Sequence, residues 1–512
     1  MTKASSSVRK ATHKDRRQKT ADNRKRNIVS GSSLIVDIEH IRQLAWTGQH
    51  AAAIDSATQA LATLGKGGSR SAPTIMSLLN LRAESYIALG NLDLAMKDAK
   101  AMKKLGTTAV LKTQALNRLA LVQMRTGDLK AAVKSATVAV KASSGNRQSK
   151  IENRQSLAIS LFRLAEAQWR ARQLEAALKT TQEAITFYQE LGDTSGTGRA
   201  YWVLSGVFFR SDRAEESRRA AQTALELCRQ AGDSYGIGNA LLSLANTDVD
   251  IAEQIQHYQQ AKSAFETAGY VERQGAVMGN LANTYGELGL HAHVRRLRRE
   301  GVERDRAMGA KLGLTVGLMG LIGSETTFGE LEAAHLHLRE LETLVPDLGD
   351  PNLEVYLFSQ RSDLAFATGD IQTAIRHQKS GLKLIKESQI SGEHTNLTTL
   401  AMLYLAAGNP AAALKATNKA TALHRAQNFA RPEGTASQYI WWWHAQALNA
   451  NKKTKEARDI LDRAYDFLLE GITNIRDAGL RRNALNKVED NRKLLQYWVK
   501  DGIKRKLPKE RL

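Results

Sequence analysis

The chain contains 512 residues, is 42% hydrophobic and carries a formal net charge of +21. This hydrophobic content excludes a wholly disordered chain, and a single cysteine, Cys228, excludes a disulfide framework and favours a reducing, cytoplasmic location. The sequence has no run of about 18 apolar residues, which excludes a membrane-spanning helix, and its first residues lack the apolar core of a secretory signal.

Residues 1–33 are predicted to form a disordered basic tail. Residues 1–28 carry ten Lys or Arg and two Asp, and no apolar period begins before Ile28. Such a tail is either a solvated segment or an electrostatic contact for nucleic acid or another polyanion. The sequence leaves both alternatives open.

Residues 34–478 repeat one short turn between two helical patterns. In its clearest copy a helical pattern runs into Gly369, Asp370 is placed to cap the next helix, and Ala374 follows on that helix. The turn position recurs at intervals averaging about 40 residues, which is the scale of helical-pair repeats. The turn positions are Gly48, Gly90, Gly127, Arg172, Asp212, Thr247, Gly289, Gly329, Gly369, Gly408 and Lys452.

Small residues keep register with these turn positions. Five residues after each turn position, nine of the eleven residues are alanine, a register that an ordinary alanine-rich bundle would not keep. Small side chains let two antiparallel helices approach closely, and hairpins that cannot bury their apolar faces alone bury them by stacking. This column comprises Ala53, Ala95, Ala132, Ala177, Ser217, Ala252, Val294, Ala334, Ala374, Ala413 and Ala457.

The repeat resembles the tetratricopeptide repeat (TPR) family. It shares Leu-Ala followed by an aromatic residue, then Gly with Asp or Asn, and then alanines five and twelve residues further on. The proline that commonly ends a unit of about 34 residues is missing. Second turns at Gly192-Asp193, Gly232-Asp233 and Gly349-Asp350 look like those of the longer variety found in MalT-like arms of bacterial regulators. The resemblance implies an all-α, right-handed α-α superhelix of about eleven hairpins.

The resemblance also implies a non-enzymatic scaffold or adaptor with a regulatory role, which binds a protein or peptide in a concave groove lined by the first helix of each pair. Carried over to this chain, the inward positions are rich in arginine with aromatic neighbours. Because arginine binds carboxylates and phosphates, an acidic peptide is the expected ligand. An arginine-rich helix face that contacts only solvent is the alternative. The groove candidates are Asn117, Arg118, Arg163, Trp169, Arg170, Arg199, Trp202, Arg210, Asn280 and Asn283.

Residues 479–503 are predicted to form a helix that caps the open end of the array, and residues 504–512 a second basic tail. Residues 481–512 carry a net charge of +7. A nucleic-acid-associated regulator that docks through its basic ends is therefore the alternative function. The apolar stripe of the capping helix consists of Leu485, Val488, Leu495, Trp498 and Val499.

No catalytic, cofactor-binding or metal-binding pattern stands out from the repeats. Carboxylates such as Glu166 and Glu183 are predicted to be scattered over helix faces, and Cys228 is predicted to be a buried packing residue. The sequence therefore predicts a binding protein without a cofactor or metal. It leaves open whether the chain forms a homo-oligomer.

Overall fold

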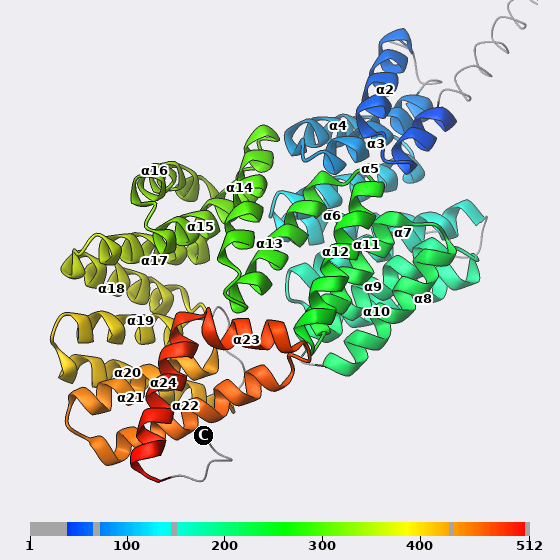
Figure 1. Cartoon of the computed structure of the whole chain (residues 1–512). Coiled ribbons are helices and arrows are strands. Elements are labelled where there is room, and N and C mark those ends of the chain that lie inside the picture. Colours follow the sequence, from blue (N-terminus) through cyan, green and yellow to red (C-terminus); the bar gives the residue numbers. More distant parts are fainter. Residues whose placement is uncertain (1–37, 65–71, 145–150, 212, 430–434, 507–512) are drawn as a thin grey trace, which may run out of the picture. The chain divides into compact units, whose positions relative to one another are not determined.

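The computed structural model describes residues 38–64, 72–144, 151–211, 213–429 and 435–506, and every regular element in these ranges is a helix (Figure 1). The predicted all-α fold class is confirmed. The basic tail predicted over residues 1–33 lies outside the described residues, as do residues 507–512 of the second predicted tail. Contacts divide the chain into two compact units, a division that the sequence analysis did not predict.

The first unit comprises residues up to Ala240 together with Ser263–Arg273. Consecutive helices pack against one another as antiparallel hairpins, with α5 on α6, α7 on α8 and α9 on α10. After a short helix over residues 38–46, its helices are α2 (His50–Leu64), α3 (Ala72–Ala88), α4 (Leu92–Leu105), α5 (Ala109–Arg125), α6 (Leu129–Ser144), α7 (Ile151–Arg170), α8 (Leu174–Glu190), α9 (Thr194–Arg210) and α10 (Ala214–Gln230).

The second unit comprises Leu241–Lys262 and the residues from Gln274 onwards. Three helices contribute residues to both units: α11 (Ser234–Thr247), α12 (Ile251–Thr267) and α13 (Val271–Glu287). The helices that follow are α14 (His291–Ala307), α15 (Lys311–Phe328), α16 (Leu331–Leu348), α17 (Pro351–Ala367), α18 (Ile371–Ser388), α19 (Glu393–Ala406), α20 (Pro410–Ala426), α21 (Ser437–Ala450), α22 (Thr454–Thr473), α23 (Ala478–Asn486) and α24 (Glu489–Lys504).

The predicted turn positions end helices in the left-handed backbone region. Every glycine among them has a positive φ, such as 86° at Gly369, which glycine adopts without steric cost. Arg172 and Lys452 adopt the same conformation. Two positions differ from this pattern: Thr247 ends α11 without a positive φ, and Asp212 lies outside the described residues.

The predicted alanine column lies in the interior of the hairpins. Its members are fully buried in most repeats, whereas Ala252 and Val294 are half-buried. Close contact through small residues explains how each hairpin joins the next, and the described helices therefore form the stacked hairpins typical of TPR proteins. Cys228 is also buried, as predicted, and burial raises the pKa of its thiol to about 12.

Within the first unit, the turn before α2 contacts the end of α12. A Cβ atom placed on Gly48 would lie 2.7 Å from the carbonyl oxygen of Thr267, so only glycine fits there. His50 is buried, and its Nε2 lies 3.0 Å from the carbonyl oxygen of Ala268 while its Nδ1 lies 3.2 Å from the hydroxyl of Ser85. The carbonyl oxygen can only accept, so Nε2 carries the proton and Nδ1 accepts from Ser85.

In the second unit, residues 479–503, predicted to form one helix, fall into two helices, α23 and α24. Trp498 is buried and stacks on Tyr465 with ring centroids 3.8 Å apart, so that α24 covers α22 of the last hairpin. Trp441 is also fully buried. Of the helices described, none combines the length and the apolarity that crossing a bilayer requires.

Candidate functional site

The candidate site lies in the first unit and is built around one face of α7. Arg163, Glu166 and Arg170 are spaced three and four residues apart, which places the three side chains together on a helix. Arg163 Nη1 donates to Glu166 Oε2 at 3.0 Å. Arg170 donates to Glu166 Oε1 through Nε at 3.2 Å and through Nη2 at 3.0 Å. One carboxylate therefore accepts from two arginines of its own helix.

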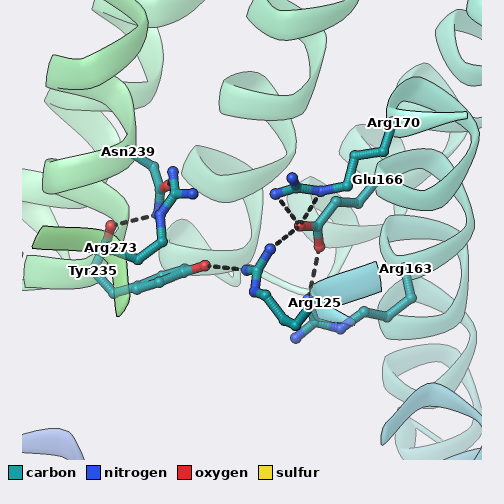
Figure 2. Close-up of polar contacts among 7 residues, drawn as sticks. All are labelled: Arg125, Arg163, Glu166, Arg170, Tyr235, Asn239 and Arg273. Atoms are coloured by element: carbon teal, nitrogen blue, oxygen red, sulfur yellow. Dashed lines mark hydrogen bonds and ion pairs between the residues drawn. The ribbon is translucent and has the colours of Figure 1, made fainter. Parts of the chain in front are cut away.

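Residues from other helices complete the cluster. Arg125 at the end of α5 directs Nη1 toward Glu166 Oε1 at 3.5 Å and donates from Nη2 to the Tyr235 hydroxyl on α11 at 2.8 Å. Arg273 on α13 donates to the side-chain oxygen of Asn239. Figure 2 shows the guanidinium groups from α5 and α7 converging on Glu166, with Tyr235 linking them to α11.

Burial and positive charge act against each other on Glu166. Burial raises the pKa of this carboxyl, but the guanidinium groups of Arg170, Arg125 and Arg163 outweigh burial and hold its pKa at about 2. Glu166 is therefore ionised. The pKa of Arg170 is lowered by burial and by the positive charges of Arg125 and Arg273, even though Glu166 opposes this shift.

The cluster carries more positive than negative charge. It contains four arginines, counting Arg273, and two carboxylates, those of Glu166 and Glu272, and Glu272 attracts Arg125. The Glu166 side chain is 0% exposed, whereas the side chains of Arg163 and Arg170 are 20% and 24% exposed. The acid thus lies beneath guanidinium groups that solvent reaches. We call Arg125, Arg163, Glu166, Arg170, Arg273 and Glu272 the arginine cluster.

Two predicted groove arginines beside the cluster are paired with acids. Arg199 forms a two-point contact with Asp233, with Nη2 donating to Oδ1 at 2.8 Å. Arg118 donates to Glu84 at 3.0 Å and to the side-chain oxygen of Asn80 at 2.9 Å. Burial raises the pKa of Glu84, but Arg118, Arg199 and Arg163 together lower it, which shows that these three arginines share one region.

Of the other predicted residues in the first unit, three pack against neighbouring helices and Arg210 lies at the surface. Trp169 and Trp202 meet edge to face, with centroids 5.7 Å apart, and Trp202 is buried. Asn117 is buried and donates to the Ser160 hydroxyl at 3.0 Å. Arg210 is exposed at the end of α9. The structure therefore brings together Arg118, Arg163, Arg170 and Arg199, with the tryptophan pair beside Arg170.

Asn280 and Asn283 belong to the second unit. Asn280 is half-buried, and Asn283 is exposed and accepts a hydrogen bond from Arg298. These two residues therefore do not join the arginine cluster within one compact unit.

The prediction that Glu166 is one of many scattered helix-face carboxylates is wrong. Its side chain is fully buried under arginines, and the spacing of Arg163 and Arg170 around it was a readable signal on one helix face. Tyr235 and Arg273 were also missed. Tyr235 is 110 residues from Arg125, and no local pattern reveals such a contact.

The described residues contain no group of three or more His, Cys, Asp or Glu side chains arranged to hold a metal ion. The chemistry that the cluster offers is hydrogen bonding and charge attraction to an oxyanion, since arginine provides several donors and does not lose its proton.

No protein-family model matches the chain, and no curated protein matches it. Among solved structures, it is similar to the Rap protein complexed with competence and sporulation factor, at 12% identity and a TM-score of 0.38 over 83% of this chain and 99% of that chain. A STAND protein with a tetratricopeptide repeat sensor from Pyrococcus horikoshii shows 14% identity and a TM-score of 0.43 over 65% and 53%. Yeast Tom70 shows 12% identity and a TM-score of 0.34 over 92% and 98%. With such low scores and identities, these similarities say nothing about what this chain binds.

Proposed function

We propose that the chain is a non-enzymatic binding protein whose arginine cluster holds an acidic segment of a partner protein. The observation that carries this proposal is the arrangement around Glu166, in which the acid is buried and the guanidinium groups of Arg163 and Arg170 are partly exposed. An incoming carboxylate would meet preorganised donors and relieve the repulsion among Arg125, Arg170 and Arg273.

Aromatic side chains next to the arginines support the proposal that the ligand is a peptide. The Arg170 guanidinium lies 5.3 Å from the Trp169 ring, and the Arg199 guanidinium lies 5.2 Å from the Tyr235 ring. Stacked arginines keep a fixed orientation, and the flat rings offer apolar surface to the stem of an acidic side chain. We further propose that the chain is a regulatory adaptor located in the cytoplasm, where the single thiol of Cys228 stays reduced.

Fluorescence anisotropy with a labelled oligo-glutamate peptide tests the proposal. We expect the double variant Arg163→Gln/Arg170→Gln to weaken binding by about tenfold or more, because each loses a charged donor. The matched control is Arg154→Gln, on the same helix, where Arg154 pairs with the exposed Glu190 and lies outside the cluster. Equal affinities for the double variant and the control, with intact helical circular dichroism, would refute the proposal.

The alternative function concerns the basic ends of the chain. Residues 1–28 and 507–512 lie outside the described residues, so nucleic-acid binding through these ends stays a prediction from the sequence. Deleting residues 1–28 should weaken nucleic-acid binding and flatten its salt dependence if that prediction holds.

A further inference from the structure

Arg298 of α14, in the second unit, lies across a helix-interior glycine of α15. A Cβ atom placed on Gly320 would lie 2.5 Å from Arg298 Cζ and 2.6 Å from its Nε. Any larger residue at this position would therefore displace the guanidinium. Glycine weakens the interior of a helix. At position 320 the lack of a side chain leaves room for the guanidinium of Arg298.

Among the residues that the structure describes, Arg298 has no acidic partner of the kind that its neighbours have. Arg295 and Arg299, on the same helix, both pair with Glu330, and Arg306 pairs with Glu340. Among the described residues, the hydrogen bond that Arg298 makes runs from Nη2 to the side-chain oxygen of Asn283, a neutral group.

The charge of Arg298 is held in a partly buried position without compensation. Its Nε is buried and has no hydrogen-bond partner among the described residues. Burial lowers the pKa of Arg298, and no carboxylate offsets this effect. Arginine stays protonated in proteins, so the charge remains and an anion beside it would be stabilised.

We propose that Arg298, supported by Asn283 and Gly320, forms an oxyanion-binding position in the second unit. The Cζ, Nε and Nη1 atoms of Arg298 lie within 2.7 Å of the Cβ position of Gly320, and Nη2 donates to Asn283, so the guanidinium is oriented before a ligand arrives. Asn283 itself is exposed, which leaves this side of the guanidinium open to solvent. The ligand chemistry is that of a carboxylate or a phosphate, both of which accept two parallel hydrogen bonds from a guanidinium.

The residues that form this position belong to the second unit, whereas the arginine cluster belongs to the first. It also differs in kind. The cluster combines several arginines with buried acids, whereas Arg298 is a single guanidinium with an amide neighbour. We therefore expect it to bind one oxyanion, with no need for an extended acidic segment.

The Nε–H signal of Arg298 in a ¹H–¹⁵N spectrum of the full chain provides the test, because a buried Nε–H exchanges slowly with water. Arg298→Lys removes this group and so assigns the signal. We expect the signal to shift saturably with inorganic phosphate or with acetate at constant ionic strength, and not with chloride. Saturation with phosphate alone identifies a phosphoryl ligand, and saturation with acetate as well identifies a carboxylate.

Arg299→Lys is the matched control, because Arg299 lies on the same helix but already has Glu330 as a partner. This variant should keep the saturable shift, and so should Arg163→Gln/Arg170→Gln. Arg298→Lys should in turn leave oligo-glutamate binding within about twofold of the wild type, because an independent site adds no binding energy there. A shift that is linear in salt and equal for phosphate, acetate and chloride would overturn the inference, whatever the outcome at the arginine cluster.

Discussion

Replacing Glu166 with glutamine tests the central electrostatic feature of the first unit. The substitution keeps the shape of the side chain but removes its negative charge. Arg163 and Arg170 would then contact a neutral amide. The NH₂ group of this amide is itself a donor, so it cannot accept a hydrogen bond from a guanidinium. Because the Glu166 side chain is 0% exposed, solvent cannot replace the lost charge.

The magnitude follows from the pKa of Glu166. The folded protein holds this pKa at about 2, compared with the ordinary value of 4.5. Each pKa unit corresponds to about 1.4 kcal/mol, so the ionised carboxylate stabilises the fold by about 3 kcal/mol at neutral pH. We expect Glu166→Gln to lower the free energy of unfolding by this order. Urea is the suitable denaturant, because it does not screen charge as guanidinium chloride does.

The pH dependence gives a second check. A carboxyl whose pKa is lowered by folding adds stability above its unfolded pKa, and this stability disappears as the pH falls toward the folded pKa. The difference between wild type and Glu166→Gln should therefore be constant near neutral pH and shrink between pH 4.5 and about 2. The control Glu190→Gln removes an exposed ion pair and should cost under about 1 kcal/mol. A loss for Glu166→Gln as small as for this control would refute the reasoning.

Two further predictions concern packing in the first unit. Gly206→Ala would place a Cβ atom 2.2 Å from Trp169, so we expect a loss of about 1–3 kcal/mol in urea unfolding and a change in tryptophan fluorescence. Gly279→Ala is the control, since nothing lies within 4 Å of its Cβ position, and equal effects of the two changes would contradict the steric explanation. His50→Ala removes the contacts to Ser85 and to the Ala268 carbonyl, so amide hydrogen exchange over residues 267–270 should accelerate. Unchanged exchange would show that His50 does not hold this segment.

The repeat itself could be predicted because its determinants are local. A glycine such as Gly369 ends a helix through its own backbone conformation, and an alanine such as Ala374 permits close packing through its own size. The same local signals failed where the repeat changes. At Thr247 the chain turns without a positive φ, and Asp250 instead caps α12 by accepting from the Ala252 amide at 2.9 Å.

The candidate site was predictable only in part. Helical periodicity places Arg163 and Arg170 on one face of α7, because it fixes which residues of a helix share a face. That these residues and Arg199 line a partner-binding groove stays a prediction. Periodicity does not give the partner of each arginine. Asp233, for example, caps α11 with one oxygen, by accepting from the Gly236 amide, and binds Arg199 as well.

The sequence by itself determined the helices, the turns between them and the small-residue columns through which hairpins stack, since these depend on residues within one or two helices. Tertiary structure alone decided that Arg125 meets Glu166 across 41 residues and Tyr235 across 110, and that Arg298, within the described part of the chain, donates to the amide of Asn283. The physical reason is that each such contact depends on the summed geometry of every intervening helix pair. A charge therefore acquires its partner, or lacks one, only when the whole unit has folded.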